Sequence, residues 1–133
     1  MYKELTQKLN KDVKFNPPAT LEEIEEVEKK LAIELPKGIK NLLLEFNGEN
    51  DLIFSTQDII ETNLTQRQIP CYMSFDSLLF IAGNGFGDYF GYAISKEEIK
   101  SSIYKWDHED DSRIWSAGGL KDLIEKYYTD QTP

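Results

Sequence analysis

Apolar residues recur at helical spacing in three parts of the chain. Such spacing puts every third or fourth side chain on one face of a helix, where it can be buried. The three stripes are Leu21, Ile24, Val27 and Leu31; Ile39, Leu42, Leu43 and Phe46; and Leu120, Leu123, Ile124 and Tyr127. The pattern predicts three amphipathic helices, and a weaker repeat at Leu5 and Leu9 predicts a short helix within residues 1–15.

Local signals mark the ends of two of these helices. Thr20 and Glu23 have the spacing of a capping box, in which each side chain accepts the other residue's backbone N–H. Pro36 suits the start of the second helix, because its missing N–H costs nothing there. Asn47 and Gly48 predict a left-handed C-cap for that helix.

Between the second and the last helix, the pattern changes to short aliphatic and aromatic runs that are typical of strands. We expect strands at residues 51–54, 78–82, 89–94 and 103–106, and a short helical turn at residues 57–63. The order of helices, sheet and helix predicts an α+β fold. We expect a mixed or antiparallel sheet of about five to six strands, with N-terminal helices and a C-terminal helix packed on it.

A glycine-rich segment, residues 78–94, lies in the middle of this strand region; its glycines are Gly83, Gly85, Gly87 and Gly91. A dinucleotide-binding loop needs G-x-G-x-x-G before a helix, but here the third glycine comes one residue early and a strand pattern follows. A β-hairpin explains the segment better, with Asn84 and Gly85 supplying positive φ at the turn. We expect Asp88 to brace this turn rather than to bind a ligand.

Length and composition indicate a single domain, residues 1–133. We expect no cofactor. The lone cysteine, Cys71, provides neither a disulfide framework nor a thiolate metal cluster, which fits a cytoplasmic protein. No apolar run approaches the length of a membrane span, and the first residues lack the hydrophobic centre of a signal peptide.

The net negative charge of the chain comes from its middle, because acidic and basic residues balance elsewhere. Residues 45–111 contain 13 acidic and four basic residues, so this segment accounts for the whole net charge of −9. An acidic surface opposes direct binding to nucleic acid and to anionic membranes, and it favours encounter with basic partners. Acidic proteins are also often simply more soluble, so the charge alone does not identify a partner.

Several segments, in this order, resemble the SUKH superfamily, which includes bacterial immunity proteins and the yeast regulator of cell-wall glucan assembly. The first is the helix pair of residues 20–48, with Leu35 and Pro36 between the helices and Asn47 and Gly48 at the end. The others are the glycine-rich segment 80–92, the strand 103–109 and the last helix. The resemblance covers about residues 20–128. One departure is Gly118-Gly119 before the last helix, where the family tends to have Ser and an aromatic residue.

Catalytic and metal chemistry have little support in the sequence. His108 is the only histidine, with Asp107, Glu109, Asp110 and Asp111 around it, and no nucleophile elbow accompanies it. The acidic run 107–111 could hold Ca²⁺ or Mg²⁺ through oxygen ligands, but it lacks the alternating spacing and the glycine of a calcium loop. We therefore expect neither an enzyme nor a metal site, and the family resemblance implies no catalytic residue.

The resemblance implies an intracellular immunity protein that binds and neutralises a cognate polymorphic toxin. We expect the toxin to be a basic protein such as a nuclease, whose cleft an acidic surface would occupy. The residues expected to contact it are Glu49, Asp51, Asp58, Glu61, Tyr104, Asp107, Glu109, Asp110, Asp111 and Trp115. Trp106 is expected in the core, while Trp115 fits either the core or an interface. The alternative is a non-catalytic regulatory or scaffold module like the yeast protein.

Overall fold

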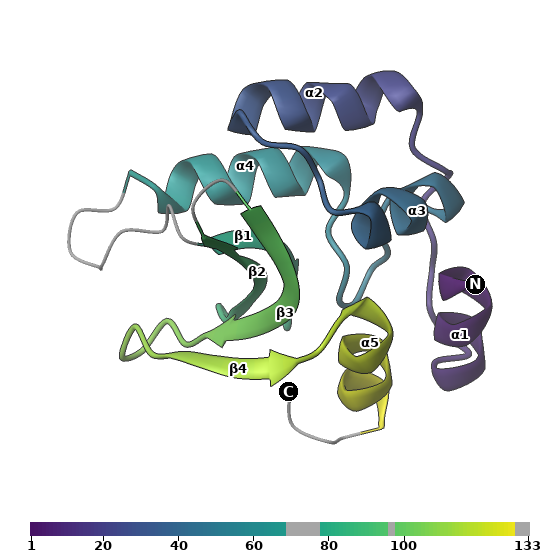
Figure 1. Ribbon diagram of the computed structural model, residues 1–133. Helices are drawn as coiled ribbons and strands as arrows, with labels where there is room; N and C mark the ends of the chain where they lie inside the picture. Colours follow the sequence, from purple (N-terminus) through teal and green to yellow (C-terminus); the bar gives the residue numbers. More distant parts are fainter. Residues whose placement is uncertain (69–77, 96–97, 130–133) are drawn as a thin grey trace.

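The computed structural model describes residues 1–68, 78–95 and 98–129. Four helices come first, a four-stranded sheet follows, and one helix ends the described chain (Figure 1). The helices are α1 (Tyr2–Leu9), α2 (Leu21–Leu31), α3 (Lys37–Glu45), α4 (Thr56–Gln66) and α5 (Leu120–Tyr128). The strands are β1 (Leu78–Gly83), β2 (Tyr89–Ser95), β3 (Glu98–Trp106) and β4 (Arg113–Ala117). Cys71 lies outside the described residues.

The predicted α+β class and element order are confirmed, but the predicted strand number is wrong. The described residues form one antiparallel sheet of four strands, in the order β1-β2-β3-β4. Segment 51–54, predicted as a strand, contributes only an isolated bridge from Ile53 to Ala82. The reason is local, because the Glu49 carboxylate accepts the backbone N–H groups of residues 51, 52 and 53. Those groups are then not available to a sheet ladder.

Two predicted helix features need correction. The short helical turn expected at 57–63 is the eleven-residue α4, which begins after Ser55, whose side chain accepts the Asp58 N–H. The left-handed C-cap expected for the second helix is absent, because α3 ends at Glu45 and its C-cap Phe46 is extended. Gly48 does have a positive φ of 79°, but in the turn beyond. The capping box of Thr20 and Glu23 is confirmed.

The main core lies between the helices and one face of the sheet. Its fully buried members include Val27 from α2, Leu42 from α3, Ile59 from α4, Ile81 from β1 and Ile124 from α5. Figure 1 shows α2 stacked on α4, which in turn lies beside β1. Burial of one apolar stripe from each of these helices is therefore what joins them to the sheet.

A smaller cluster of Leu78, Phe80 and Trp106 lies apart from this core. Leu78 and Phe80 alternate along β1 with the core residues Leu79 and Ile81, so β1 is buried on both faces. Trp106 is 2% exposed, which confirms its predicted place in the core.

The predicted hairpin at the glycine-rich segment is confirmed, with one correction. β1 and β2 pair antiparallel and are joined by residues 84–88. The positive φ angles belong to Gly85 (81°) and Gly87 (98°), whereas Asn84 is not in the left-handed region. Asn84 instead holds the loop by bonds to Asp88, with its backbone N–H on the Asp88 carbonyl at 3.2 Å and its Nδ2 on Oδ2 at 3.1 Å.

Candidate partner-binding surface

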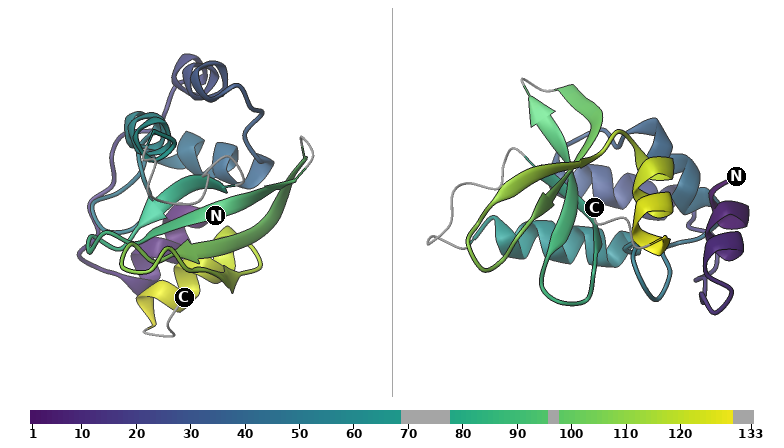
Figure 2. Two further views of the ribbon diagram at one scale, coloured as in Figure 1. Left: turned by 90° about the vertical axis from the view of Figure 1, so that its left-hand side faces the viewer. Right: turned by 90° about the horizontal axis from the view of Figure 1, so that it is seen from below.

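Three loops gather at one end of the sheet. Because neighbouring strands are antiparallel, residues 84–88, after β1, and residues 107–112, after β3, leave the sheet at the same end. The bridge from Ile53 to Ala82 holds residues 49–55 beside them. We call these three segments, together with the first turn of α4, the loop end. In the right-hand view of Figure 2, the loop after β1 and the loop after α3 extend toward the lower edge, and the loop after β3 lies to their left.

A histidine–aspartate pair connects two of these loops. Asp88 Oδ1 lies 2.8 Å from His108 Nδ1 and accepts the His108 backbone N–H at 3.2 Å. The hydrogen bond to Asp88 raises the pKa of His108 above its ordinary value. Burial alone would raise the pKa of Asp88, but the hydrogen bonds from His108 and Asn84 outweigh it, so the pKa is lowered. The contact therefore favours the charged form of both groups, and the expected bracing role of Asp88 fits this geometry.

The acidic loop 107–112 contains both structural and exposed carboxylates. Asp111, at a left-handed φ of 58°, accepts Trp106 Nε1 at 2.6 Å and Arg113 Nη2 at 3.1 Å through Oδ1. Asp107 Oδ1 accepts the backbone N–H of Glu109 at 2.9 Å. Glu109 and Asp110 are exposed. Asp111 thus fixes the loop, while Glu109 and Asp110 remain accessible to solvent.

Glu49 is a buried carboxylate that organises the neighbouring loop. Besides the three backbone N–H groups described above, it accepts the Tyr128 hydroxyl of α5 through Oε2. The side chain is therefore saturated with donors, and its residue is 9% exposed. Sequence reasoning placed Glu49 in a partner interface, whereas the structure gives it an internal role.

A recess of about 340 Å³ lies between residues 49–58 and the glycine-rich loop. Asp51 and Asp58 line it, and both are exposed. In the described parts of the chain, neither carboxylate forms an ion pair with a basic side chain. Asp51 accepts the Tyr127 hydroxyl at 3.2 Å. Burial, followed by the charge of Asp51, raises the pKa of Tyr127 to about 12.

Three residues predicted for the interface lie outside the loop end. Glu61 is exposed further along α4, where it accepts Gln57 Nε2 at 2.8 Å. Tyr104 and Trp115 face each other across β3 and β4. Tyr104 is half-buried against the small cluster, whereas Trp115 is 51% exposed, with Lys126 Nζ 4.6 Å from its ring centroid.

Phe86 is a residue that sequence reasoning missed. It lies at the tip of the glycine-rich loop and is 80% exposed, although it is a large apolar side chain. The glycines of this loop predict a hairpin turn but do not point to Phe86. An aromatic residue between two glycines of a hairpin turn was the available signal, since a turn tip has little chance of being buried.

Metal chemistry is not needed to explain this site. Donor atoms of Asp88, Asp107 and His108 lie within 4.8 Å of one another, a spacing that one divalent cation could span. Each of these groups already has a hydrogen-bond partner within the protein. Those bonds account for the arrangement, and we assign no cation to it.

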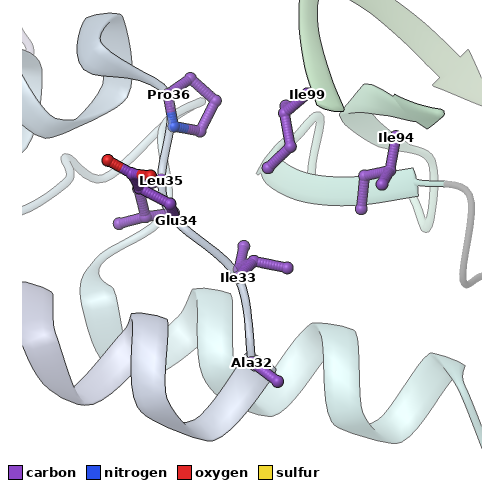
Figure 3. A pocket seen from close by; sticks show the side chains of 7 residues that line it. All are labelled: Ala32, Ile33, Glu34, Leu35, Pro36, Ile94 and Ile99. Atoms are coloured by element: carbon purple, nitrogen blue, oxygen red, sulfur yellow. The ribbon is translucent and has the colours of Figure 1, made fainter. Parts of the chain in front are cut away.

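A recess of about 560 Å³ lies at the opposite end of the sheet (Figure 3). The link between α2 and α3 forms one side of it, and Ile94 and Ile99 form the other. Glu34 is the one ionisable residue among the seven that line it. A catalytic or ligand site usually needs several convergent polar groups beside its apolar lining, which this recess does not provide.

No helix in the described parts of the chain is long and apolar enough to cross a membrane. A search of curated proteins found no match. The model of the SUKH_6 family, described as SMI1-KNR4 cell-wall, matches residues 21–124. This match covers α2 to α5 except for the last turn of α5, and it includes every loop of the loop end. The predicted resemblance is therefore confirmed, and the chain belongs to the SUKH_6 family.

Proposed function

We propose that this protein is an immunity protein that binds and neutralises a cognate toxin through the loop end. SUKH domains are generally non-catalytic, and the family includes toxin immunity proteins. A binding role also suits the site, whose charged side chains are spread over exposed loops rather than gathered in an enclosed pocket.

The observation that carries this proposal is the placement of exposed carboxylates from two distant segments, 49–58 and 107–112, at one end of the sheet. Asp51, Asp58, Glu109 and Asp110 lie at the same end of the sheet although up to 59 positions separate them, from 51 to 110. A surface of one charge steers an oppositely charged protein toward it and contributes to the choice of partner. The toxin should therefore present a basic surface, as a nuclease does at its substrate cleft.

The exposure and position of the side chains support a smaller set of contact residues than the sequence predicts. We propose that Asp51, Asp58, Glu109 and Asp110 pair with basic side chains of the toxin, with Asp107 beside them. Glu49 and Asp111 maintain the shape of the loops through the internal bonds described above. Glu61, Tyr104 and Trp115 lie outside the loop end and are not needed for the proposal.

Growth rescue tests this function. The C-terminal domain of the protein encoded next to this gene would be expressed in a bacterium that lacks the present chain. We expect growth arrest, rescue by co-expression of the wild-type chain, and a 1:1 complex in size-exclusion chromatography. Absence of both rescue and complex, with several weak partners instead, would favour the regulatory or scaffold alternative.

A further inference from the structure

Phe86 is an exposed apolar side chain held on a well-supported loop. Its backbone N–H donates to Asn84 Oδ1 at 2.9 Å, and Asn84 is itself bonded to Asp88. Asp88 in turn pairs with His108 from the neighbouring loop. Because these bonds already order the loop backbone, little backbone freedom is lost when a partner covers the ring, and more of the gain from its burial contributes to affinity.

The recess described above begins at the base of the same loop. Gly83, Gly85 and Gly87 line it on this side. The rings of Phe54 and Tyr89 also line it; they pack edge to face, with their centroids 5.8 Å apart. Asp51 and Asp58 add two carboxylates. Among the described residues these two carboxylates make no ion pair, although Asp51 accepts hydrogen bonds from Asn10 and Tyr127. An aromatic face next to such carboxylates suits a guanidinium, which stacks on rings and donates hydrogen bonds from a planar edge.

We propose that the loop end receives one arginine side chain of its protein partner in this recess, while Phe86 enters an apolar pocket on the same partner. This inference rests on the proposed function for the location of the interface and adds how the partner is recognised. The carboxylates around Phe86 and the recess determine the kind of partner, because an apolar tip bordered by carboxylates favours a protein with a basic surface around its apolar pocket.

Binding of an arginine side chain in the recess can be tested without the toxin. N-acetyl-arginine amide would be titrated into the ¹⁵N-labelled protein, with N-acetyl-citrulline amide, its uncharged analogue, as the control. We expect saturable shifts of the amide signals of residues 50–58 and 83–89 with the arginine compound alone. The double variant Asp51→Asn/Asp58→Asn should abolish them, whereas Glu22→Gln/Glu25→Gln on α2 should not. Equal shifts with both compounds, or no local shifts, would overturn the claim that the recess binds an arginine side chain.

The role of Phe86 is tested in the toxin complex. Leu21 provides a matched control, because it is also apolar and 67% exposed but lies at the start of α2. We expect Phe86→Ala to weaken binding about 30-fold or more, mainly through faster dissociation, and Leu21→Ala to leave it unchanged. If Phe86→Ala binds like the wild type in a system where the wild type rescues growth, the inference is wrong and the proposed function stands. If the wild type forms no complex, the proposed function and the docking role of Phe86 both fail. The arginine titration then still shows whether the recess binds an arginine side chain.

Discussion

His108 Nδ1 lies 2.8 Å from Asp88 Oδ1, and this contact ties the glycine-rich loop to the acidic loop. The two residues are 20 positions apart, but the pairing of Tyr89 with Trp106 in the sheet brings them together. Gly87 packs so closely on the imidazole that an added Cβ would lie 3.0 Å from Nδ1. The pair therefore fixes the relative position of two loops that carry the proposed interface.

The pair predicts a defined pH dependence of stability. The raised pKa of His108 stabilises the fold fully below the ordinary histidine pKa, and this contribution is lost as the pH rises through the folded-state value. The lowered pKa of Asp88 stabilises the fold above the ordinary aspartate value and is lost as the pH falls through the folded-state value.

We therefore expect the melting temperature of the wild type to exceed that of His108→Gln more at about pH 5.5 than at about pH 8.5. Thermal unfolding of both proteins at the two pH values measures this difference. Because His108 is the only histidine, its titration can be followed directly by NMR. A difference in melting temperature that does not change with pH would contradict the raised pKa of His108.

Replacing Glu49 should affect the fold more than any exposed acid of the loop end. Glu49→Gln removes a buried charge that accepts three backbone N–H groups and the Tyr128 hydroxyl, so we expect a loss of roughly 2–3 kcal/mol in the free energy of unfolding. Asp51→Asn, next to it and exposed, should change this free energy by less than about 0.5 kcal/mol. Urea denaturation measures the free energy of unfolding of both variants. Similar losses in the two would argue against an internal role for Glu49.

Gly48, directly before the loop end, and Gly85, within it, should respond very differently to alanine. An added Cβ at Gly48 would lie 2.5 Å from the backbone nitrogen of Ser55, whereas at Gly85 it meets nothing within 4 Å. Both have positive φ, so both variants carry backbone strain of about 1–2 kcal/mol. Gly48→Ala adds a backbone overlap and should cost at least about 3 kcal/mol. Equal losses in the free energy of unfolding, measured by chemical denaturation, would contradict the close approach of Gly48 to the Ser55 backbone.

Much of the helical part of this fold follows from local pattern. The capping box at Thr20 and most of the predicted stripes of α2, α3 and α5 are present in the structure. The exceptions are Leu21, which is exposed, and Phe46, which is buried but lies just beyond α3. α4 was underestimated because it buries polar residues, which weaken an apolar stripe. Asn63 is the clearest case, since it uses its amide to bond both the N–H and the carbonyl of Phe80 at the edge of β1.

The candidate site was less predictable, because its geometry depends on contacts between distant segments. The excess of acids in the middle of the chain was visible, but their separation into internal and exposed groups was not. Glu49 and Asp58 look alike in sequence, and only the position of Tyr128 on α5 and the turn after α3 makes Glu49 internal. The partner of His108 was sought among residues 107–111, whereas strand register supplies Asp88.

The central claim is that the exposed acids of the loop end, rather than net charge, bind the toxin. The decisive measurement compares two variants that lose the same charge. One replaces the loop-end residues by Asp51→Asn, Asp58→Asn, Glu109→Gln and Asp110→Asn. The other changes exposed acids elsewhere, by Glu4→Gln, Glu25→Gln, Glu26→Gln and Glu34→Gln.

Calorimetric titration of each variant with the toxin domain gives the affinities. We predict that the loop-end variant loses at least about 100-fold in affinity and most of the salt dependence, since neutralising several paired charges costs more than 1 kcal/mol each in a desolvated contact. The control variant should bind within about threefold of the wild type, as expected for charges outside the contact. Equal weakening of the two variants, or full affinity in the loop-end variant, would contradict the claim.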